Sequence, residues 1–186
     1  MNFTQDWFTY NIPHLTELVG LLPMRKRFLE VGCFEGRATC WFLEHALDDD
    51  GEIVCIDPFT GSMEHDSIDL SDLYNRFISN VAEVEKSSQC VSVMKEYSFD
   101  ALAQLITRKQ QFDFIYVDGD HSYLGATQDL NLALSKVKPK GIIAGHDYAH
   151  DYKTVLCAVN DFLDQHNLQL DYITLDKLPS FGIIKK

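Results

Sequence analysis

Strand-like and helix-like segments alternate along the whole chain, and this alternation restricts the fold more than any other feature. Short runs rich in β-branched and aromatic residues predict strands at residues 27–31, 53–56, 90–94, 112–117 and 141–144. Apolar residues at helical spacing predict helices at 13–22, 36–47, 69–86, 98–107, 123–137 and around 155–162. Strands that alternate with helices form βαβ units, so the sequence predicts a doubly wound α/β fold with a mostly parallel sheet.

The end of the chain departs from this alternation. Residues 172–175 and 181–184 are two strand-like runs joined only by residues 176–180. A connection this short cannot hold a crossover helix, so the two strands are expected to pair antiparallel. The sequence therefore predicts a parallel sheet that ends in an antiparallel hairpin.

The most regular helical pattern lies in residues 123–137. Tyr123, Thr127, Leu130, Leu134 and Val137 recur at steps of four, three, four and three residues. This spacing places them on one face of a helix.

The length of 186 residues suits one domain whose core needs no disulfide or metal. We expect a single domain over residues 1–186, with 1–24 as a leading helical segment and 25–186 as the core. Residues 6–11 and 60–72 are expected to form a lid over the site. For Trp7 and Phe8 in the first of these segments, simple packing is the alternative.

The charge of the chain excludes some partners. Sixteen basic and 28 acidic side chains give a net charge of −12, which repels nucleic-acid backbones and anionic membrane surfaces. The five cysteines are widely spaced and form no CxxC pair, so neither a disulfide framework nor a zinc ribbon is expected. With no signal peptide or membrane span in the sequence, the expected location is the cytoplasm.

Ligands of open α/β sheets bind beyond the carboxyl ends of the parallel strands. After the first predicted strand comes EVGCFEG, residues 30–36, whose two glycines permit a tight turn and a close approach to a ligand. The spacing GxxxG differs from the GxGxxG of dinucleotide binders, and a purely structural turn is the alternative. Asp57 follows the second strand, where an acid can accept both hydroxyls of a ribose. A turn-forming Asp-Pro is the alternative there.

Two polar clusters follow the fourth and fifth predicted strands. They are DGDHSY, residues 118–123, and HDY, residues 146–148. Side chains from neighbouring strand ends converge, so these groups could hold a divalent cation or remove a proton from a substrate hydroxyl. A surface turn is the alternative for the first cluster.

Four segments together resemble a known family. FLEVGCFEGRATCWFL, IVCIDPFTGS, FDFIYVDGDHSY and GIIAGHDY are similar to class I S-adenosylmethionine-dependent methyltransferases, and more narrowly to the small bacterial branch related to macrocin-type sugar O-methyltransferases. The resemblance covers residues 25–186. It implies a Rossmann-like, seven-stranded sheet whose last strand is antiparallel, which agrees with the hairpin predicted above.

The resemblance also implies roles for individual residues. Glu30 and Gly32 match the start of the methionine-binding loop, which Gly36 closes, and Asp57 matches the acid that holds the ribose. Tyr97 and Ser98 fall where the family contacts adenine. The implied cofactor-binding set is Glu30, Gly32, Cys33, Phe34, Gly36, Asp57, Pro58, Tyr97, Ser98 and Asp118.

The implied catalytic residues are Asp118 and His121. Asp118 matches a carboxylate that binds Mg²⁺ in metal-dependent members, and His121 lies at the offset of the general base. A histidine that only caps the following helix is the alternative. The implied metal ligands are Asp118, His146 and Asp147. The candidate divalent cations are Mg²⁺, Mn²⁺ and Zn²⁺. Since Mg²⁺ prefers oxygen ligands, an imidazole at position 146 makes Mn²⁺, Zn²⁺ or no metal possible instead.

The sequence therefore predicts an enzyme that transfers a methyl group from S-adenosylmethionine to a small-molecule hydroxyl of sugar or natural-product type. The expected partner is the acceptor, and a homodimer is compatible with the sequence. A non-catalytic S-adenosylmethionine-binding protein is one alternative, and a metal-dependent hydrolase that uses the Asp/His cluster is another. An NAD-dependent dehydrogenase is disfavoured by the glycine spacing.

Overall fold

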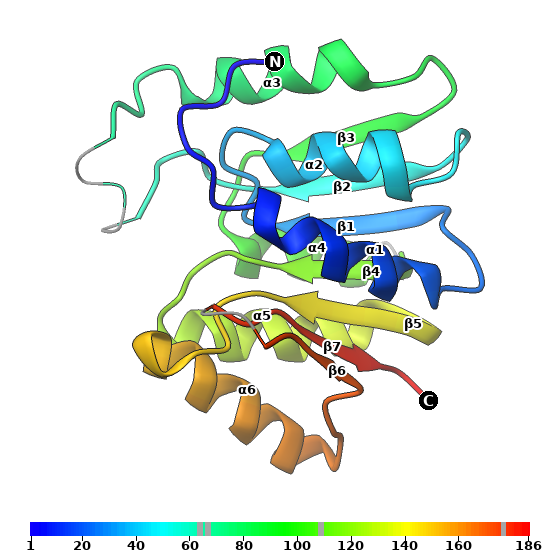
Figure 1. Ribbon diagram of the computed structural model, residues 1–186, viewed down its shortest axis with the longest axis vertical. Helices are drawn as coiled ribbons and strands as arrows, with labels where there is room; N and C mark the ends of the chain where they lie inside the picture. The colour runs from blue at the N-terminus through cyan, green and yellow to red at the C-terminus, as the bar shows by residue number, and fades with distance from the viewer. Residues whose placement is uncertain (63–64, 66–67, 108–109, 176–177) are drawn as a thin grey trace.

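The computed structural model describes residues 1–62, 65, 68–107, 110–175 and 178–186. Within this part of the chain, seven strands form one sheet in the order β3-β2-β1-β4-β5-β7-β6 (Figure 1). The parallel strands are β1 (Arg27–Val31), β2 (Glu52–Ile56), β3 (Cys90–Met94), β4 (Phe112–Val117) and β5 (Val137–Gly145). The predicted doubly wound, mostly parallel sheet is confirmed.

The antiparallel hairpin at the end of the chain is also confirmed. Strand β7 (Phe181–Ile184) lies between β5 and β6 (Tyr172–Ile173) and pairs antiparallel with both. Strand β6 is shorter than predicted, since it ends at Ile173, and Leu175 is 98% exposed. Residues 176–177 of the predicted connection lie outside the described residues.

Helices cover both faces of the sheet, as Figure 1 shows. One face packs against α1 (Ile12–Gly20), α2 (Arg37–Trp41) and α3 (Leu73–Val84), and the other against α4 (Ser98–Thr107), α5 (Tyr123–Lys136) and α6 (Lys153–His166). Successive strand residues alternate between the two cores: Phe28 packs on the first and Leu29 on the second. Strands buried on both faces explain why the predicted runs are continuously apolar.

The boundary between α5 and β5 differs from the prediction. The helix stops at Lys136, and β5 begins at Val137, which pairs with Phe112. Pro139 disfavours helical geometry in the residue before it, so the chain is already extended there.

The buried face of α5 also differs from the predicted stripe. Ala126, Asp129, Leu130 and Ala133 are buried, whereas Tyr123 is exposed. The two alanines let the helix approach the sheet closely, an effect that apolar spacing alone does not predict.

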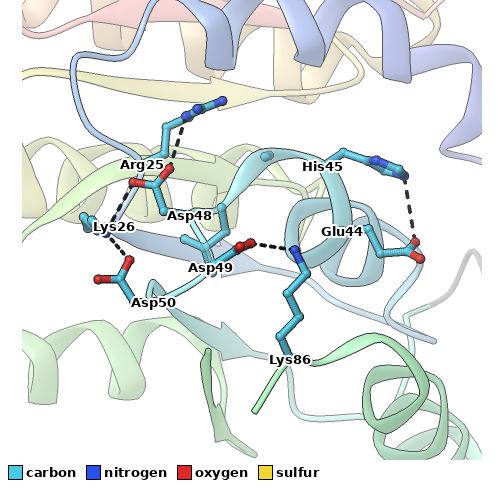
Figure 2. Close-up of a pocket in the computed structure, with 10 residues that line it drawn as sticks. Arg25, Lys26, Glu44, His45, Asp48, Asp49, Asp50 and Lys86 are labelled. Atoms are coloured by element: carbon cyan, nitrogen blue, oxygen red, sulfur yellow. Dashed lines mark hydrogen bonds and ion pairs between the residues drawn. The ribbon is translucent and has the colours of Figure 1, made fainter. Parts of the chain in front are cut away.

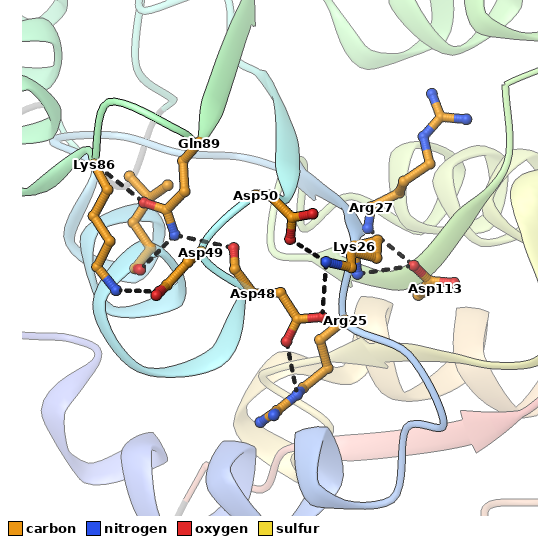
Figure 3. Close-up of polar contacts among 10 residues, drawn as sticks. Arg25, Lys26, Arg27, Asp48, Asp49, Asp50, Lys86, Gln89 and Asp113 are labelled. Carbon is orange, nitrogen blue, oxygen red and sulfur yellow. Dashed lines mark hydrogen bonds and ion pairs between the residues drawn. The ribbon is translucent and has the colours of Figure 1, made fainter.

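Polar contacts organise the amino ends of the parallel strands (Figure 3). Asp113, at the start of β4, accepts hydrogen bonds from the backbone N–H groups of Lys26 (3.1 Å) and Arg27 (2.9 Å). Gln89 donates to the carbonyl oxygens of Leu43 (2.9 Å) and Asp48 (3.4 Å). These bonds tie the loops at this edge to the strands and leave the opposite, carboxyl edge for the candidate site.

Candidate active site

Neighbouring protein atoms leave no room for a side chain at the glycines of the loop after β1. Gly32 has φ of +82°, and a Cβ there would lie 2.0 Å from the carbonyl oxygen of Asp118. The ends of β1 and β4 approach this closely because the Asp118 N–H donates to the Val31 carbonyl at 2.8 Å. Gly36 has φ of +80°, and its Cβ would meet the ring of Phe77 on α3 at 2.9 Å. The tight turn inferred from the sequence therefore has a definite steric cause.

Asp57 organises that same loop. Its Oδ2 accepts hydrogen bonds from the backbone N–H groups of Cys33 (2.8 Å) and Phe34 (2.9 Å), and its Oδ1 accepts one from Phe59 (2.6 Å). A carboxylate can accept about four hydrogen bonds, so one position is left for a ligand hydroxyl. Its assignment to the ribose stays a prediction, to which the structure adds a role in shaping the loop.

Glu30 lies buried beneath the loop. Thr39 donates to its Oε2 at 2.6 Å, while Oε1 has no hydrogen-bond partner among the described residues. Burial, reinforced by the charges of Asp118 and Asp57, raises the pKa of Glu30 well above its ordinary value. The predicted methionine-binding acid therefore lies at the floor of the site with one buried oxygen that makes no hydrogen bond within the described part of the chain.

Glu30 also lies within 4.8 Å of the thiols of Cys33 and Cys55. Burial raises the pKa of both thiols, that of Cys33 well above its ordinary value. Both thiols are therefore held in their neutral form by burial.

The predicted adenine side of the site lies at the start of α4. Ser98 begins this helix, and Tyr97 before it is 66% exposed. Near these residues the structure adds Asp129, which the sequence analysis missed. Asp129 is 1% exposed, and an added Cβ on Gly119 would lie 3.3 Å from its Oδ2. Burial raises the pKa of Asp129 to about 6.

The two polar clusters predicted from the sequence meet after β4 and β5. The Nε2 of His121 lies 3.5 Å from Oδ1 of Asp118 and 3.4 Å from Oδ2 of Asp147. Although burial would raise the pKa of Asp118, the adjacent imidazole of His121 holds it below its ordinary value. The arrangement therefore keeps a carboxylate charged beside an imidazole.

The structure distinguishes the two histidines of this cluster. Ligand atoms of Asp118, His121 and Asp147 all lie within 4.8 Å of one another, a group that does not include His146. His146 is buried, and its Nδ1 lies 3.0 Å from Oδ1 of Asp147. The structure thus places His121 beside both carboxylates and His146 against Asp147, and the choice of metal ligands stays a prediction.

The leading segment crosses the carboxyl edge of the sheet (Figure 1). Thr4 donates to the Glu35 carboxylate through its N–H and its hydroxyl, each at 2.7 Å. The ring of Trp7 lies 5.2 Å from that of Phe34 and 5.4 Å from that of His65. Tyr10 then reaches Nε2 of His146 at 3.3 Å.

Residues 6–11 thus contact the loop after β1 through Trp7 and the end of β5 through Tyr10, and their role as a lid stays a prediction. Phe8 is buried against Trp41, at a ring distance of 5.9 Å, so packing is the correct interpretation for that residue. Of the second predicted lid segment, residues 63–64 and 66–67 lie outside the described part of the chain.

A different hollow of about 460 Å³ lies at the amino edge of the sheet (Figure 2). Its charged groups pair with one another: Arg25 with Asp48 at 3.7 Å, Lys26 with Asp48 and Asp50, and Lys86 with Asp49 at 2.6 Å. One strand length of about 16 Å separates the two edges. The charged side chains that line this hollow are therefore already paired with one another in a network of ion pairs.

The model contains no helix, among the residues it describes, that is long and apolar enough to cross a membrane.

Comparison with known proteins adds a family. Residues 29–148 match the family model described as a methyltransferase domain. An uncharacterized protein of Acanthamoeba polyphaga mimivirus, R132, is 27% identical over 139 residues, which cover 72% of this chain and 57% of that protein. The match thus spans little more than half of the length of that relative.

Two solved structures share the fold. An O-methyltransferase from Bacillus cereus, in complex with SAH, is 19% identical and superposes with a TM-score of 0.73 over 98% of this chain and 84% of that chain. The O-methyltransferase TomG from Streptomyces achromogenes, in complex with SAM, is 18% identical with a TM-score of 0.65 over 94% and 80% of the two chains.

Proposed function

The chain belongs to the methyltransferase-domain family, and on this premise we propose that it transfers the methyl group of S-adenosylmethionine to a hydroxyl of a small molecule. The observation that carries the choice of a hydroxyl is the convergence of Asp118, His121 and Asp147 at the carboxyl edge, beside the glycine loop. The net charge of −12 supports a small-molecule acceptor over RNA. Sugar-type acceptors, to which the sequence resemblance points, are one class within this proposal.

The cofactor would lie along the ends of β1, β2 and β4. Asp57 keeps one acceptor position for a ribose hydroxyl, and Glu30 offers its unfilled Oε1 to the methionine part. Cys33, Phe34 and Pro58 would line this cradle, with Tyr97 and Ser98 at the adenine end. Two neighbours in the same fold carry SAM or SAH, which supports this choice of cofactor.

Methyl transfer is an in-line displacement at the carbon attached to the sulfonium. The acceptor oxygen forms the new bond, the carbon–sulfur bond breaks, and its electron pair stays on sulfur to give neutral S-adenosylhomocysteine. The protein mainly aligns oxygen, carbon and sulfur. It must also remove the proton of the hydroxyl, whose pKa is high.

In the first version of the mechanism, His121 takes that proton. Its Nε2 faces the carboxylates of Asp118 and Asp147, which orient the ring and stabilise the imidazolium that forms. Both carboxylates only accept, so they would favour a proton on Nε2, and Nδ1 would then be the nitrogen that takes the proton of the acceptor.

In the second version, a divalent ion occupies the cluster. Ligand atoms of Asp118, His121 and Asp147 lie within 4.8 Å of one another, so these three side chains would hold the ion together. The donor set of Asp118, His121 and Asp147 therefore fits Mn²⁺ or Zn²⁺ better than Mg²⁺. When bound, the ion would lower the pKa of the acceptor hydroxyl.

The test is a screen for transfer of labelled methyl from S-adenosylmethionine to sugars, phenols and amines, with and without EDTA. We expect methylation of a hydroxyl acceptor and a loss of about 10²–10⁴-fold in turnover for His121→Ala. His45→Ala, at an exposed histidine on the other side of the fold, is the matched control. Methylation of amines alone, or full activity of His121→Ala, would refute the proposal, and activity in EDTA would refute its metal version.

A further inference from the structure

Four side chains form a continuous series of polar contacts from the leading segment to the catalytic cluster. The hydroxyl of Tyr10 lies 3.3 Å from Nε2 of His146, whose Nδ1 lies 3.0 Å from Oδ1 of Asp147. The other oxygen of Asp147 lies 3.4 Å from Nε2 of His121. His146 and Asp147 are 6% and 5% exposed, so water competes little for these contacts.

The chemistry of the donors and acceptors gives this series a direction. An ionised carboxylate only accepts, so the nitrogen of His146 that faces Asp147 carries the proton. In the neutral ring, Nε2 is then an acceptor, and the phenol of Tyr10 donates to it. The two contacts therefore select one tautomer of His146 and fix the plane of its ring.

The backbone at Asp147 is also unusual. Asp147 has φ of +59°, a left-handed conformation that is uncommon for non-glycine residues, although aspartate adopts it more readily than most. That backbone conformation sets the direction in which the Asp147 side chain leaves the backbone. The contact with Nδ1 of His146 then holds one carboxylate oxygen, so that the other faces His121.

We propose that Tyr10 and His146 are a positioning pair, which aims Asp147 at His121 and makes the leading segment part of the acid–base centre. Neither residue of the pair is a catalytic residue, because both act through Asp147. The inference rests on the proposed function, in which His121 and Asp147 serve the acceptor hydroxyl. It adds that Tyr10, which is far from Asp147 and His121 in the sequence, influences how these two side chains are positioned.

The experiment is ¹⁵N NMR of the histidine rings in the full-length protein, at one neutral pH. Signals of His146 are assigned from their loss in His146→Asn. We expect the wild type to show a protonated Nδ1 and an unprotonated Nε2 on His146. Tyr10→Phe removes only the hydroxyl, and it should shift both the Nε2 signal of His146 and the ring signals of His121, which Tyr10 does not touch.

The chain supplies a matched control. The hydroxyl of Tyr172 also lies 3.3 Å from a histidine nitrogen, Nδ1 of His14, and neither residue belongs to the series of contacts described above. Tyr172→Phe should leave the signals of His146 and His121 unchanged. His146→Asn keeps an N–H near Asp147 and should preserve the His121 signals, whereas His146→Leu should shift them.

Any one of three results would contradict the proposed positioning pair. They are a His146 ring that is protonated on Nε2, His121 signals that do not shift in Tyr10→Phe, and equal shifts of the His121 signals in His146→Asn and His146→Leu. Titration of the same samples with S-adenosylhomocysteine separates this inference from the proposed function. Absence of binding by the wild type would refute the proposed function, whereas the proposal that Tyr10 and His146 position Asp147 is tested by the ring signals alone.

Discussion

Replacing Asp129 by asparagine should stabilise the protein, and by an amount that depends on pH. Burial raises the pKa of this carboxyl group from 3.8 to about 6. Each unit of difference between folded and unfolded states corresponds to about 1.4 kcal/mol, so ionisation of Asp129 costs the folded state about 3 kcal/mol at pH 7.5. The nearby side chain of Ser98 offsets only part of this cost.

The sign follows from the direction of the pKa shift. The folded protein binds this proton more tightly than the unfolded protein does. Ionisation of the carboxyl group therefore lowers the free energy of unfolding progressively as pH rises from about 4 through about 6. Asparagine has nearly the same shape and never ionises. The free energy of unfolding of Asp129→Asn should therefore exceed that of the wild type by about 3 kcal/mol at pH 7.5 and by only about half of that at pH 5.0.

Urea unfolding followed by circular dichroism at the two pH values measures this difference. Asp164→Asn, on the exposed side of α6, is the matched control and should change stability little at either pH. The reasoning would be refuted if Asp129→Asn gave the same stability difference at both pH values, or if it destabilised the protein at pH 7.5.

Three further predictions concern the site. Gly32→Ala should unfold or severely destabilise the protein in thermal melts, because its Cβ would lie 2.0 Å from the Asp118 carbonyl oxygen; a normal melting temperature would contradict this. Asp57→Asn should lose about 1–3 kcal/mol in urea unfolding, since an amide nitrogen cannot accept the loop N–H groups; unchanged stability would mean that these bonds do not hold the loop. Glu35→Gln should increase the solvent exposure of Trp7, measured by fluorescence quenching, because Thr4 loses its charged acceptor; equal quenching in both proteins would argue against the anchor.

The sheet could be predicted from the sequence because its strands are short apolar runs with clear ends. The antiparallel pairing of β6 with β7 required only the shortness of the connection at residues 176–180, whereas the place of β7 beside β5 did not follow from it. The buried face of α5 could not be predicted in the same way. Its alanines and Asp129 carry a weak apolar signal, and their burial depends on how closely the helix approaches the sheet.

The site was predictable where its residues follow strand ends. Asp118, His121 and Asp147 converge because β4 and β5 are neighbours in the sheet. The support of Asp147 by Tyr10 and His146 was not predictable, because it joins residues 136 positions apart. Nor could the sequence show that Gly32 faces the Asp118 carbonyl group, since that contact depends on the register of two strands.

The central claim is that the carboxyl edge of the sheet binds S-adenosylmethionine, and calorimetric titration with S-adenosylhomocysteine tests it most directly. The account predicts one ligand per chain for the wild type, binding weakened at least about tenfold by Asp57→Ala, and unchanged binding for Lys86→Ala at the amino-edge hollow. Absence of binding by the wild type, or binding lost in Lys86→Ala and kept in Asp57→Ala, would contradict it.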